Sequence, residues 1–361
     1  MSLIISPISA TSHAIYMVWY TSWPKSTNQS GDRVSQGSHP MIASSGPARP
    51  ETPIDGAALL VPAPTLPLVS IVTPSYNQGR FIRQTIESVL GQDYPNIEYW
   101  VVDGGSADET VAILREYDGD PRFHWVSEPD DGQGDAINKG VRLTQGELLA
   151  WLNADDIYLP GAVSRAVQAL QDHAEAALVY GHAALIDRDG AVVEECAYVE
   201  PFSLRRLIHY GDFIMQPAAF FRRGPFLEVG GLDSSLHYSL DYDLWIKLAL
   251  RYPVQYLPQL LARARIYPET KTASGGLDRL DEIARMIQPY GRSRLPALFY
   301  RVMLKACLQA ALRALASGEW AGAWARGRQA AGYSIALAYR TLRYGPQGYR
   351  SGAQIGEEGR R

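Results

Sequence analysis

The sequence predicts an α/β protein built on a nucleotide-binding, Rossmann-like sheet, parallel or mixed, that is flanked by helices. Strand-like and helix-like segments alternate over roughly 85 residues from Leu68, which is the pattern of a parallel sheet with right-handed crossovers. Apolar residues make up 46% of the chain and charged residues 20%, close to the average of globular proteins. The length of 361 residues, at roughly 150 residues per domain, allows one large domain or two ordinary ones.

The first half supplies the clearest elements. Leu68–Thr73 is an apolar, β-branched run that ends at Pro74, which predicts a buried strand. Apolar residues at helical spacing then predict a helix over 79–92. The same two patterns predict strands over 97–102, 123–127 and 147–152, and helices over 108–117 and 134–144.

The second half is less regular. We expect a strand over 177–186, a hairpin turn at 187–190 and a returning strand over 191–195. An apolar segment at 217–221 and a helix over 241–251 follow, and the sheet is expected to become mixed in this half.

The two ends differ from the middle in composition. Residues 1–66 are predicted to form a disordered arm, because the stretch from Thr21 to Pro67 is rich in Ser, Pro, Gly and Thr. The more apolar start of this arm lacks the features of a signal peptide. Residues 276–361 form a basic, largely helical region. Twelve basic and three acidic residues from Arg292 onward give 12 − 3 = +9. A polar stripe recurs every four residues there, and two interpretations stay open: a helix packed on the domain, or a basic amphipathic helix on an anionic membrane surface. The stripe consists of Arg301, Lys305, Gln309 and Arg313.

Composition also excludes several classes of protein. The formal charge is 34 − 38 = −4, which argues against a bulk nucleic-acid binder. The two cysteines, Cys196 and Cys307, lack partners at zinc or disulfide-framework spacing. No apolar run reaches the roughly 18 residues of a spanning helix. Neither a Walker loop nor a Gly-x-Gly-x-x-Gly turn follows a strand, which argues against kinase-type and dehydrogenase sites.

Acidic residues follow three of the four strands expected in the first half. They are Asp103, the pair Asp130 and Asp131, and the pair Asp155 and Asp156. Ligands of open α/β sheets bind beyond the carboxyl ends of the strands, so these side chains are expected to converge. Clustered carboxylates repel one another unless a cation compensates, and hard oxygen ligands indicate Mg²⁺ or Mn²⁺. The competing interpretation of each acid alone is a helix cap.

Four ordered motifs resemble family 2 glycosyltransferases, which are inverting enzymes of the glycosyltransferase A fold that use nucleotide-diphosphate sugars. The motifs are Ser70–Asn77, Val102–Thr110, Trp151–Asp156 and Asp241–Trp245. The resemblance covers about residues 68–271 and makes 67–275 the expected catalytic domain. It implies a metal-dependent, hexosyltransferase-like enzyme.

The resemblance also implies roles for individual residues. Thr73, Pro74 and Tyr76 would border the nucleotide, and Asp103 would hydrogen-bond the base. Asn153-Ala154-Asp155 resembles the family's D-x-D element, with Asp155 and Asp156 at the metal. Apart from the resemblance, the helix that begins near Gly132 would direct its N-terminus at the sugar or phosphate, and Lys139 on it is either a donor-binding residue or a surface charge. Three positions depart from the family pattern: Asn153 for Asp, Leu240 for a Glu before the base, and Tyr267 for a metal-binding His.

By the same resemblance, Asp241 is the expected general base. A single displacement needs a carboxylate to take the proton of the acceptor hydroxyl, and a metal would stabilise the leaving diphosphate. The competing role of Asp241 is an N-cap. The expected donor is a nucleotide-diphosphate sugar, with UDP-sugars favoured, and the expected acceptor is a saccharide or a lipid-linked sugar in cell-surface or exported polysaccharide synthesis. A cytoplasmic protein, peripheral at the inner face of the membrane through its C-terminal region, would fit this acceptor. The alternatives are a nucleotidyltransferase and a catalytically degenerate sugar-nucleotide-binding protein.

Overall fold

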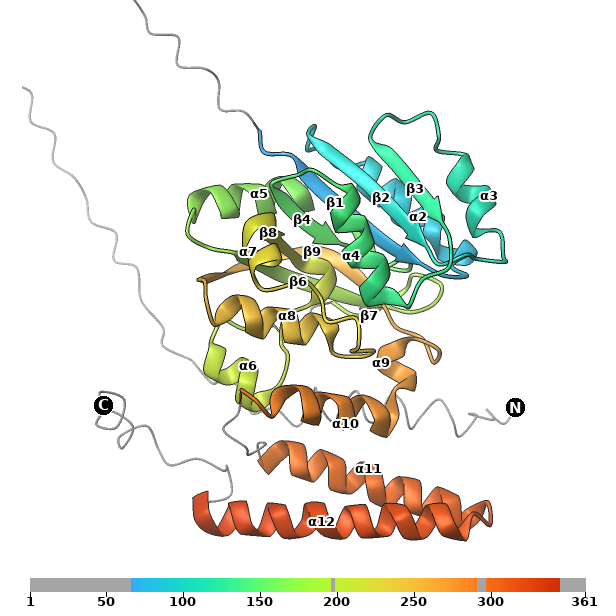
Figure 1. The fold of residues 1–361 in the computed structure, drawn as a ribbon, viewed down its shortest axis with the longest axis vertical. Helices are drawn as coiled ribbons and strands as arrows, with labels where there is room; N and C mark the ends of the chain where they lie inside the picture. The colour runs from blue at the N-terminus through green and yellow to red at the C-terminus, as the bar shows by residue number, and fades with distance from the viewer. Residues whose placement is uncertain (1–65, 196–198, 291–296, 345–361) are drawn as a thin grey trace, which may run out of the picture.

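The computed structural model describes residues 66–195, 199–290 and 297–344. Apart from Leu66, the predicted disordered arm lies outside the described residues, as does the last part of the basic C-terminal region. Figure 1 shows the described chain as a sheet between two layers of helices, with a helical hairpin at one end of the molecule.

The alternation of strands and helices predicted for the first half is confirmed, with ends within two residues of those expected. The helix expected over 108–117 is shorter than predicted, because the Asp108 carboxylate accepts hydrogen bonds from the backbone N–H groups of Gly79 and Thr110 ahead of the helix. The elements are β1 (Val69–Ser75), α2 (Gly79–Leu90), β2 (Ile97–Asp103), α3 (Thr110–Arg115), β3 (Phe123–Ser127), α4 (Gln133–Leu143) and β4 (Leu148–Trp151).

The second half contains the predicted hairpin, as β6 and β7, and the predicted helix, as α8. The apolar segment at 217–221 covers parts of a 3₁₀ turn (η1) and a strand (β8). The elements are β5 (Ile157–Tyr158), α5 (Ala162–Asp172), β6 (Leu178–Ile186), β7 (Val192–Glu194), α6 (Leu204–Tyr210), η1 (Gln216–Ala218), β8 (Ala219–Arg222), α7 (Arg223–Glu228), α8 (Leu240–Ala249), β9 (Val254–Arg265), α9 (Lys271–Ser274), α10 (Gly276–Ile287), α11 (Ala297–Ala316) and α12 (Trp320–Tyr344).

The sheet is mixed, as predicted. Its strand order in the described chain is β3-β2-β1-β4-β8-β6-β9-β5, with β7 beside β6. The strands β3, β2, β1 and β4 are parallel, β8 runs antiparallel to both of its neighbours, and β9 is parallel to β6. The carboxyl ends of β1, β2, β3 and β4 therefore meet at one edge.

Each face of the sheet carries its own apolar core, because side chains alternate along a strand. In β1, Val69 and Ile71 face the cluster beneath α2, α3 and α5, whereas Val72 faces the cluster with α4, α6 and α8. Helix α4 approaches β1 so closely that a Cβ on Gly140 would lie 2.4 Å from Cγ1 of Val72. A glycine is required there for the helix to reach the sheet.

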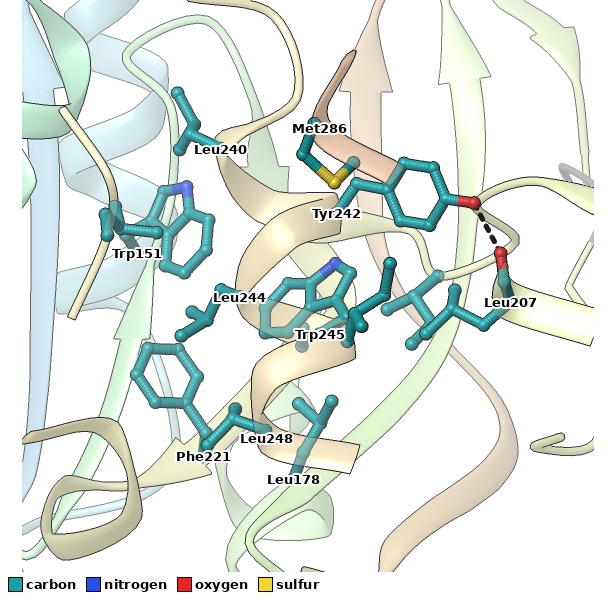
Figure 2. Packing of buried hydrophobic residues seen from close by; sticks show 14 of the residues in the cluster. Trp151, Leu178, Leu207, Phe221, Leu240, Tyr242, Leu244, Trp245, Leu248 and Met286 are labelled. Carbon is teal, nitrogen blue, oxygen red and sulfur yellow. Dashed lines mark hydrogen bonds between the residues drawn. The ribbon is translucent and has the colours of Figure 1, made fainter. Parts of the chain in front are cut away.

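Helix α8 is a core helix. Figure 2 shows Trp245 among Leu244 and Leu248 of the same helix, with Trp151 of β4 and Phe221 of β8 alongside. The rings of Trp151 and Trp245 stack with centroids 5.4 Å apart. This packing fixes the start of α8, and with it Asp241, relative to the end of β4.

The C-terminal helices extend the same layer. Leu280 and Met286 of α10, and Met303 and Ala306 of α11, belong to the core cluster that contains α8. Helices α11 and α12 lie side by side beyond α10, at the end of the molecule farthest from β2 and β3 (Figure 1). The part of the chain that the structure describes has no helix with the length and apolar character needed to cross a membrane.

Candidate active site

A cleft of about 780 Å³ lies at the carboxyl ends of the parallel strands. Its walls come from the loops after β1 to β4, from the segments before η1 and α8, and from the end of β9 through α10. Of the nine residues predicted for the site, the following line the cleft: Pro74, Tyr76, Asn153, Asp155, Asp156 and Asp241. Three others, Thr73, Asp103 and Lys139, are absent from its lining.

Tyr76 forms part of the open side of the cleft. It follows β1 directly, and 63% of its surface is exposed. The next residue, Asn77, has a φ of 52°, in the left-handed region that asparagine tolerates. Its backbone N–H donates to Ser106 Oγ at 2.7 Å, which joins the loop after β1 to the loop after β2. The loop that carries Tyr76 is thus joined to the loop after β2, and Tyr76 lines the cleft with an exposed ring.

The side chains of Thr73 and Asp103 are buried and form hydrogen bonds within the protein. The Thr73 hydroxyl lies 2.9 Å from the Tyr99 hydroxyl in the interior. Asp103 is fully buried and accepts from the backbone N–H of Ser106 at 2.8 Å and from Ser127 Oγ at 2.7 Å. The Asp103 carboxylate holds the loop after β2, so that Gly104, and not Asp103, reaches the cleft.

Lys139 lies on α4 outside the cleft. Its Nζ pairs with Glu128 Oε1 at 3.0 Å. Three other basic residues line the cleft, namely Arg265, Lys271 and Arg279. Lys271 is the first residue of α9. Its Nζ donates to Gln133 Oε1 at 3.0 Å and to the carbonyl of His237 at 3.2 Å, and burial lowers the pKa of the Lys271 ammonium.

Asn153 connects three elements at the end of β4. Its Oδ1 accepts from Gln133 of α4 at 2.8 Å, and its Nδ2 donates to Asp156 and to Gln216 of η1, each at 3.1 Å. Gln216 in turn donates to the carbonyl of Trp151 at 2.7 Å. Asn153 therefore fixes the turn that carries the two aspartates.

The two aspartates after β4 differ in what they face. Asp156 is 4% exposed, and its oxygens accept from the backbone N–H of Arg265 at 2.8 Å and from Asn153. Burial and the negative charge of Asp155 raise the pKa of Asp156 well above its ordinary value. Asp155 accepts at Oδ2 from the Tyr267 hydroxyl at 3.0 Å, and burial raises its pKa as well.

This geometry tests the fit of a divalent cation. No cluster of three or more His, Cys, Asp or Glu side chains suitable for a metal occurs among the described residues. Both oxygens of Asp156 are engaged by the protein, which leaves Asp155 as the carboxylate that can turn to a ligand. Mg²⁺ is commonly held by one or two carboxylates together with phosphate oxygens of a substrate. Asp155 therefore fits a cation that arrives with a phosphorylated ligand, and Asp156, which also lines the cleft, is the more buried of the two carboxylates.

Asp241 lies in the first turn of α8. Its Oδ1 accepts from the backbone N–H of Tyr242 at 2.8 Å. Burial raises the pKa of Asp241, and the positive charges of Arg279 and Lys271 act in the opposite direction. A carboxylate with a raised pKa is suited to accept a proton near neutral pH.

A second carboxylate, Asp212, lines the same part of the cleft and was not predicted from the sequence. It accepts from the backbone N–H of Ile214 at 2.9 Å. Burial and the negative charge of Asp241 raise the pKa of Asp212 well above its ordinary value. No motif or strand end marks Asp212 in the sequence, and only its aspartate type gives a signal.

The mixed sheet, with an acidic cleft at the ends of its parallel strands, has the glycosyltransferase A fold. Two solved structures share the fold. Staphylococcus aureus TarS 1–349 in complex with UDP-GlcNAc has a TM-score of 0.52 at 15% identity, over 77% of this chain and 93% of that one. The mannosyltransferase PcManGT from Pyrobaculum calidifontis, in complex with GDP-Man and Mn²⁺, has a TM-score of 0.51 at 20% identity, over 76% and 87%.

Sequence comparison gives the family. Residues 70–226 match the family described as Glycosyl transferase family 2. An uncharacterized glycosyltransferase of Rickettsia typhi is 32% identical over 228 residues, which are 60% of this chain and 69% of that protein. Chondroitin synthase of Escherichia coli is 31% identical over 196 residues, which are 54% of this chain and 28% of the synthase. The chain belongs to glycosyltransferase family 2 and is a nucleotide-sugar glycosyltransferase.

Proposed function

We propose that this chain transfers a hexosyl group with inversion from a nucleotide-diphosphate sugar to an acceptor hydroxyl, with Asp241 as the general base. The observation that carries the proposal is the presence of Asp155 and Asp241 in one cleft, at the ends of two elements that Trp151 and Trp245 hold together. Asp155 can hold a cation that binds the diphosphate, and Asp241 can accept the proton of the acceptor hydroxyl.

The proposed transfer is a single displacement at the anomeric carbon. The acceptor oxygen bonds to the anomeric carbon, its proton passes to Asp241, and the bond from that carbon to the diphosphate breaks, which releases a nucleoside diphosphate. The raised pKa of Asp241 supports this role, because a stronger base accepts the hydroxyl proton more readily. Lys271 and Arg279 line the same cleft and would offset the charge of the bound diphosphate.

A Mg²⁺ or Mn²⁺ ion is proposed as cofactor, held by Asp155 and the donor diphosphate. The chemistry that such an ion supplies when bound is Lewis-acid stabilisation of the charge on the leaving group. Tyr267, whose hydroxyl donates to Asp155, would orient this carboxylate. In this proposal Asp156 shapes the turn and does not bind the ion.

The donor and acceptor classes are further parts of the proposal. We favour a UDP-sugar as donor; UDP-GlcNAc and GDP-Man, each bound by one of the two structural neighbours, both belong in a donor panel. The acceptor is proposed to be a saccharide or lipid-linked sugar of a cell-surface or exported polysaccharide. A cytoplasmic enzyme in peripheral contact with the inner face of the membrane would reach such an acceptor.

Replacement of Asp241 by Asn tests the role of the base. The substitution keeps the size of the side chain and removes the proton acceptor, so turnover is expected to fall by about 10²-fold or more. Donor binding, measured by calorimetry with UDP-, GDP- and dTDP-sugars and Mn²⁺, is expected to stay within a few-fold. Turnover is measured as release of nucleoside diphosphate in the presence of a panel of saccharide acceptors.

Asp278→Asn is the matched control, since Asp278 is an exposed acid near the start of α10 that does not line the cleft. It is expected to keep full turnover. Turnover by Asp241→Asn at the level of this control would contradict the proposed mechanism.

A further inference from the structure

The outer surface of the α11–α12 hairpin exposes large apolar side chains. Of the fourteen large hydrophobic residues exposed in the described chain, six lie on these two helices. On α11 the inner face is buried, with Met303 and Ala306 in the main core. Large apolar surfaces left in water mark sites where a soluble domain meets a partner or a membrane.

The exposed residues follow the helical repeat. Leu308, Leu312 and Leu315 are spaced by four and three residues along α11, and 49%, 66% and 43% of their surfaces are exposed. Trp320 and Trp324, one turn apart at the start of α12, are 72% and 70% exposed. The two groups flank the turn at Ser317–Glu319 that joins the helices. We name these five residues the apolar tip.

The hairpin that carries the apolar tip is strongly basic. Residues 297–344 contain seven basic residues and one acidic residue, Glu319, for a charge of 7 − 1 = +6. The remaining sequence carries 27 − 37 = −10. The positive charge is thus carried by the same hairpin as the apolar tip, with Lys305 and Arg313 of α11 and Arg328 of α12 exposed.

The apolar tip and the positive charge of the hairpin together indicate which kind of partner covers the tip. A second copy of the hairpin would bring +6 against +6, and like charges oppose such pairing. An anionic lipid surface offers the opposite charge. Tryptophan also favours the boundary between headgroups and acyl chains, and basic amphipathic helices lie in that plane without crossing the bilayer.

We propose that the α11–α12 hairpin docks this enzyme on an anionic lipid bilayer, with the apolar tip in the headgroup boundary and the basic residues against lipid phosphates. The proposal deepens the proposed function, because it names the surface by which the enzyme would reach a lipid-linked acceptor. Docking itself does not depend on transfer and is measured without a sugar donor.

The test is co-sedimentation of the full chain with vesicles of phosphatidylcholine alone or with 30% phosphatidylglycerol. Wild type is expected to bind the phosphatidylglycerol vesicles at least ~10-fold more tightly than the neutral ones, and to be released by 0.5 M salt, which screens surface charge. Trp320→Glu/Trp324→Glu is expected to bind them at least ~10-fold more weakly than wild type, because two charges would enter the headgroup boundary.

Leu227→Glu/Leu250→Glu is the matched control, since both leucines are more than half exposed and lie on α7 and at the end of α8. This control is expected to bind as wild type does. Equal binding by the tryptophan variant and wild type, or no binding of wild type to anionic vesicles, would overturn the proposal. So would wild-type self-association in light scattering that the tryptophan substitutions abolish, because a second copy would then cover the tip. Release of nucleoside diphosphate with a soluble acceptor, measured on the same variants, reports on the proposed function separately.

Discussion

Asp212 and Asp241 place two carboxylates in the same buried part of the cleft, and this arrangement has a cost in stability. The pKa of each is raised by burial, and the pKa of Asp212 is raised further by the negative charge of Asp241. A raised pKa means that the folded protein holds its proton more tightly than the unfolded chain does. The stability of the fold therefore decreases as the pH rises above the ordinary carboxylate value of about 4.

Replacement of Asp212 by Asn is expected to stabilise the protein, and the gain is expected to grow with pH. Asparagine can still accept the hydrogen bond from the N–H of Ile214 and never ionises. One unit of pKa shift corresponds to about 1.4 kcal/mol, so we expect a melting temperature raised by roughly 2 °C or more at pH 7.5 and by little at pH 4.5. Differential scanning calorimetry across this range is the measurement.

Asp233→Asn provides a control of opposite sign. Hydrogen bonds from Ser235 lower the pKa of the exposed Asp233, so its charged form stabilises the fold above the ordinary carboxylate pKa. The control is expected to lose stability, relative to wild type, as the pH rises. A gain for Asp212→Asn that stays the same from pH 4.5 to pH 7.5 would show that Asp212 carries no raised pKa.

Asp155 and Asp156 are adjacent but are expected to respond differently to substitution. Asp155→Ala is expected to lose the extra thermal stabilisation that Mn²⁺ gives to the donor complex, because it removes the proposed metal ligand. Asp156→Asn is expected to retain the Mn²⁺ response, since its oxygens face Arg265 and Asn153. Ligand at 100 times its Kd stabilises by about 2.7 kcal/mol, which a thermal-shift assay resolves. A Mn²⁺ response that is lost in Asp156→Asn but kept in Asp155→Ala would contradict these two roles.

At the level of residues, the sequence could predict the acids at strand ends, because parallel strands deliver their carboxyl ends to one edge. The sequence could not predict which of these side chains face the cleft. The inward turn of Asp103 depends on Ser127, which is 24 positions away. Lys139 lies outside the cleft and pairs there with Glu128. Asp212 follows no strand, so no periodic pattern pointed to it.

At the level of elements, the end of β9 binds the turn after β4 and so positions Asp155 and Asp156. Arg265 at its end is 6% exposed and donates through its guanidinium to the carbonyls of Asp155, Asp187 and Arg188 and to Gln84. The same guanidinium lies 4.8 Å from the centre of the Phe81 ring. One side chain therefore connects α2, the β6–β7 turn and the loop that carries Asp155.

Arg265→Met is expected to destabilise the protein by roughly 2–4 kcal/mol, because several buried acceptors lose a charged donor. This corresponds to a melting temperature lower by about 5–10 °C. Donor affinity is expected to fall as well, since the turn that holds Asp155 loses its tether. Arg263→Met, at a half-buried position two residues earlier on the same strand, is the control and is expected to change both quantities little. Equal effects of the two substitutions would contradict the role assigned to Arg265.

The sequence did not predict β9, and the reason is physical. Pro258 interrupts the segment, and a proline within a run argues against a central strand. In the structure Pro258 lies where the register between β6 and β9 shifts, between the pairs Tyr180–Tyr256 and His182–Leu260. Such an irregularity accommodates a residue without a backbone N–H. Helix α8 was predictable, by contrast, because Leu244, Trp245 and Leu248 recur at helical spacing and no proline interrupts them.

At the level of the whole molecule, the order of strands and helices in the first half followed from the sequence, whereas the place of the C-terminal helices did not. A stripe of charged residues is compatible with a helix packed on the domain and with one on a membrane. The structure shows α11 contributing Met303 and Ala306 to the core while its leucines at 308, 312 and 315 remain exposed. The helix thus packs on the domain and still keeps an outer face for the proposed lipid contact.

The wide separation along the chain of the residues that build the cleft also governs when the enzyme becomes active during its own synthesis. The Asp156 carboxylate accepts a hydrogen bond from the backbone N–H of Arg265, which lies 109 positions later in the chain. At about 5–20 residues per second on a ribosome, that interval is on the order of 5–20 seconds. The nascent chain can form the parallel strands early, yet the wall from β9 to α10 is completed last. The cleft can therefore be complete only after translation has passed Arg279, the last of its lining residues along the chain.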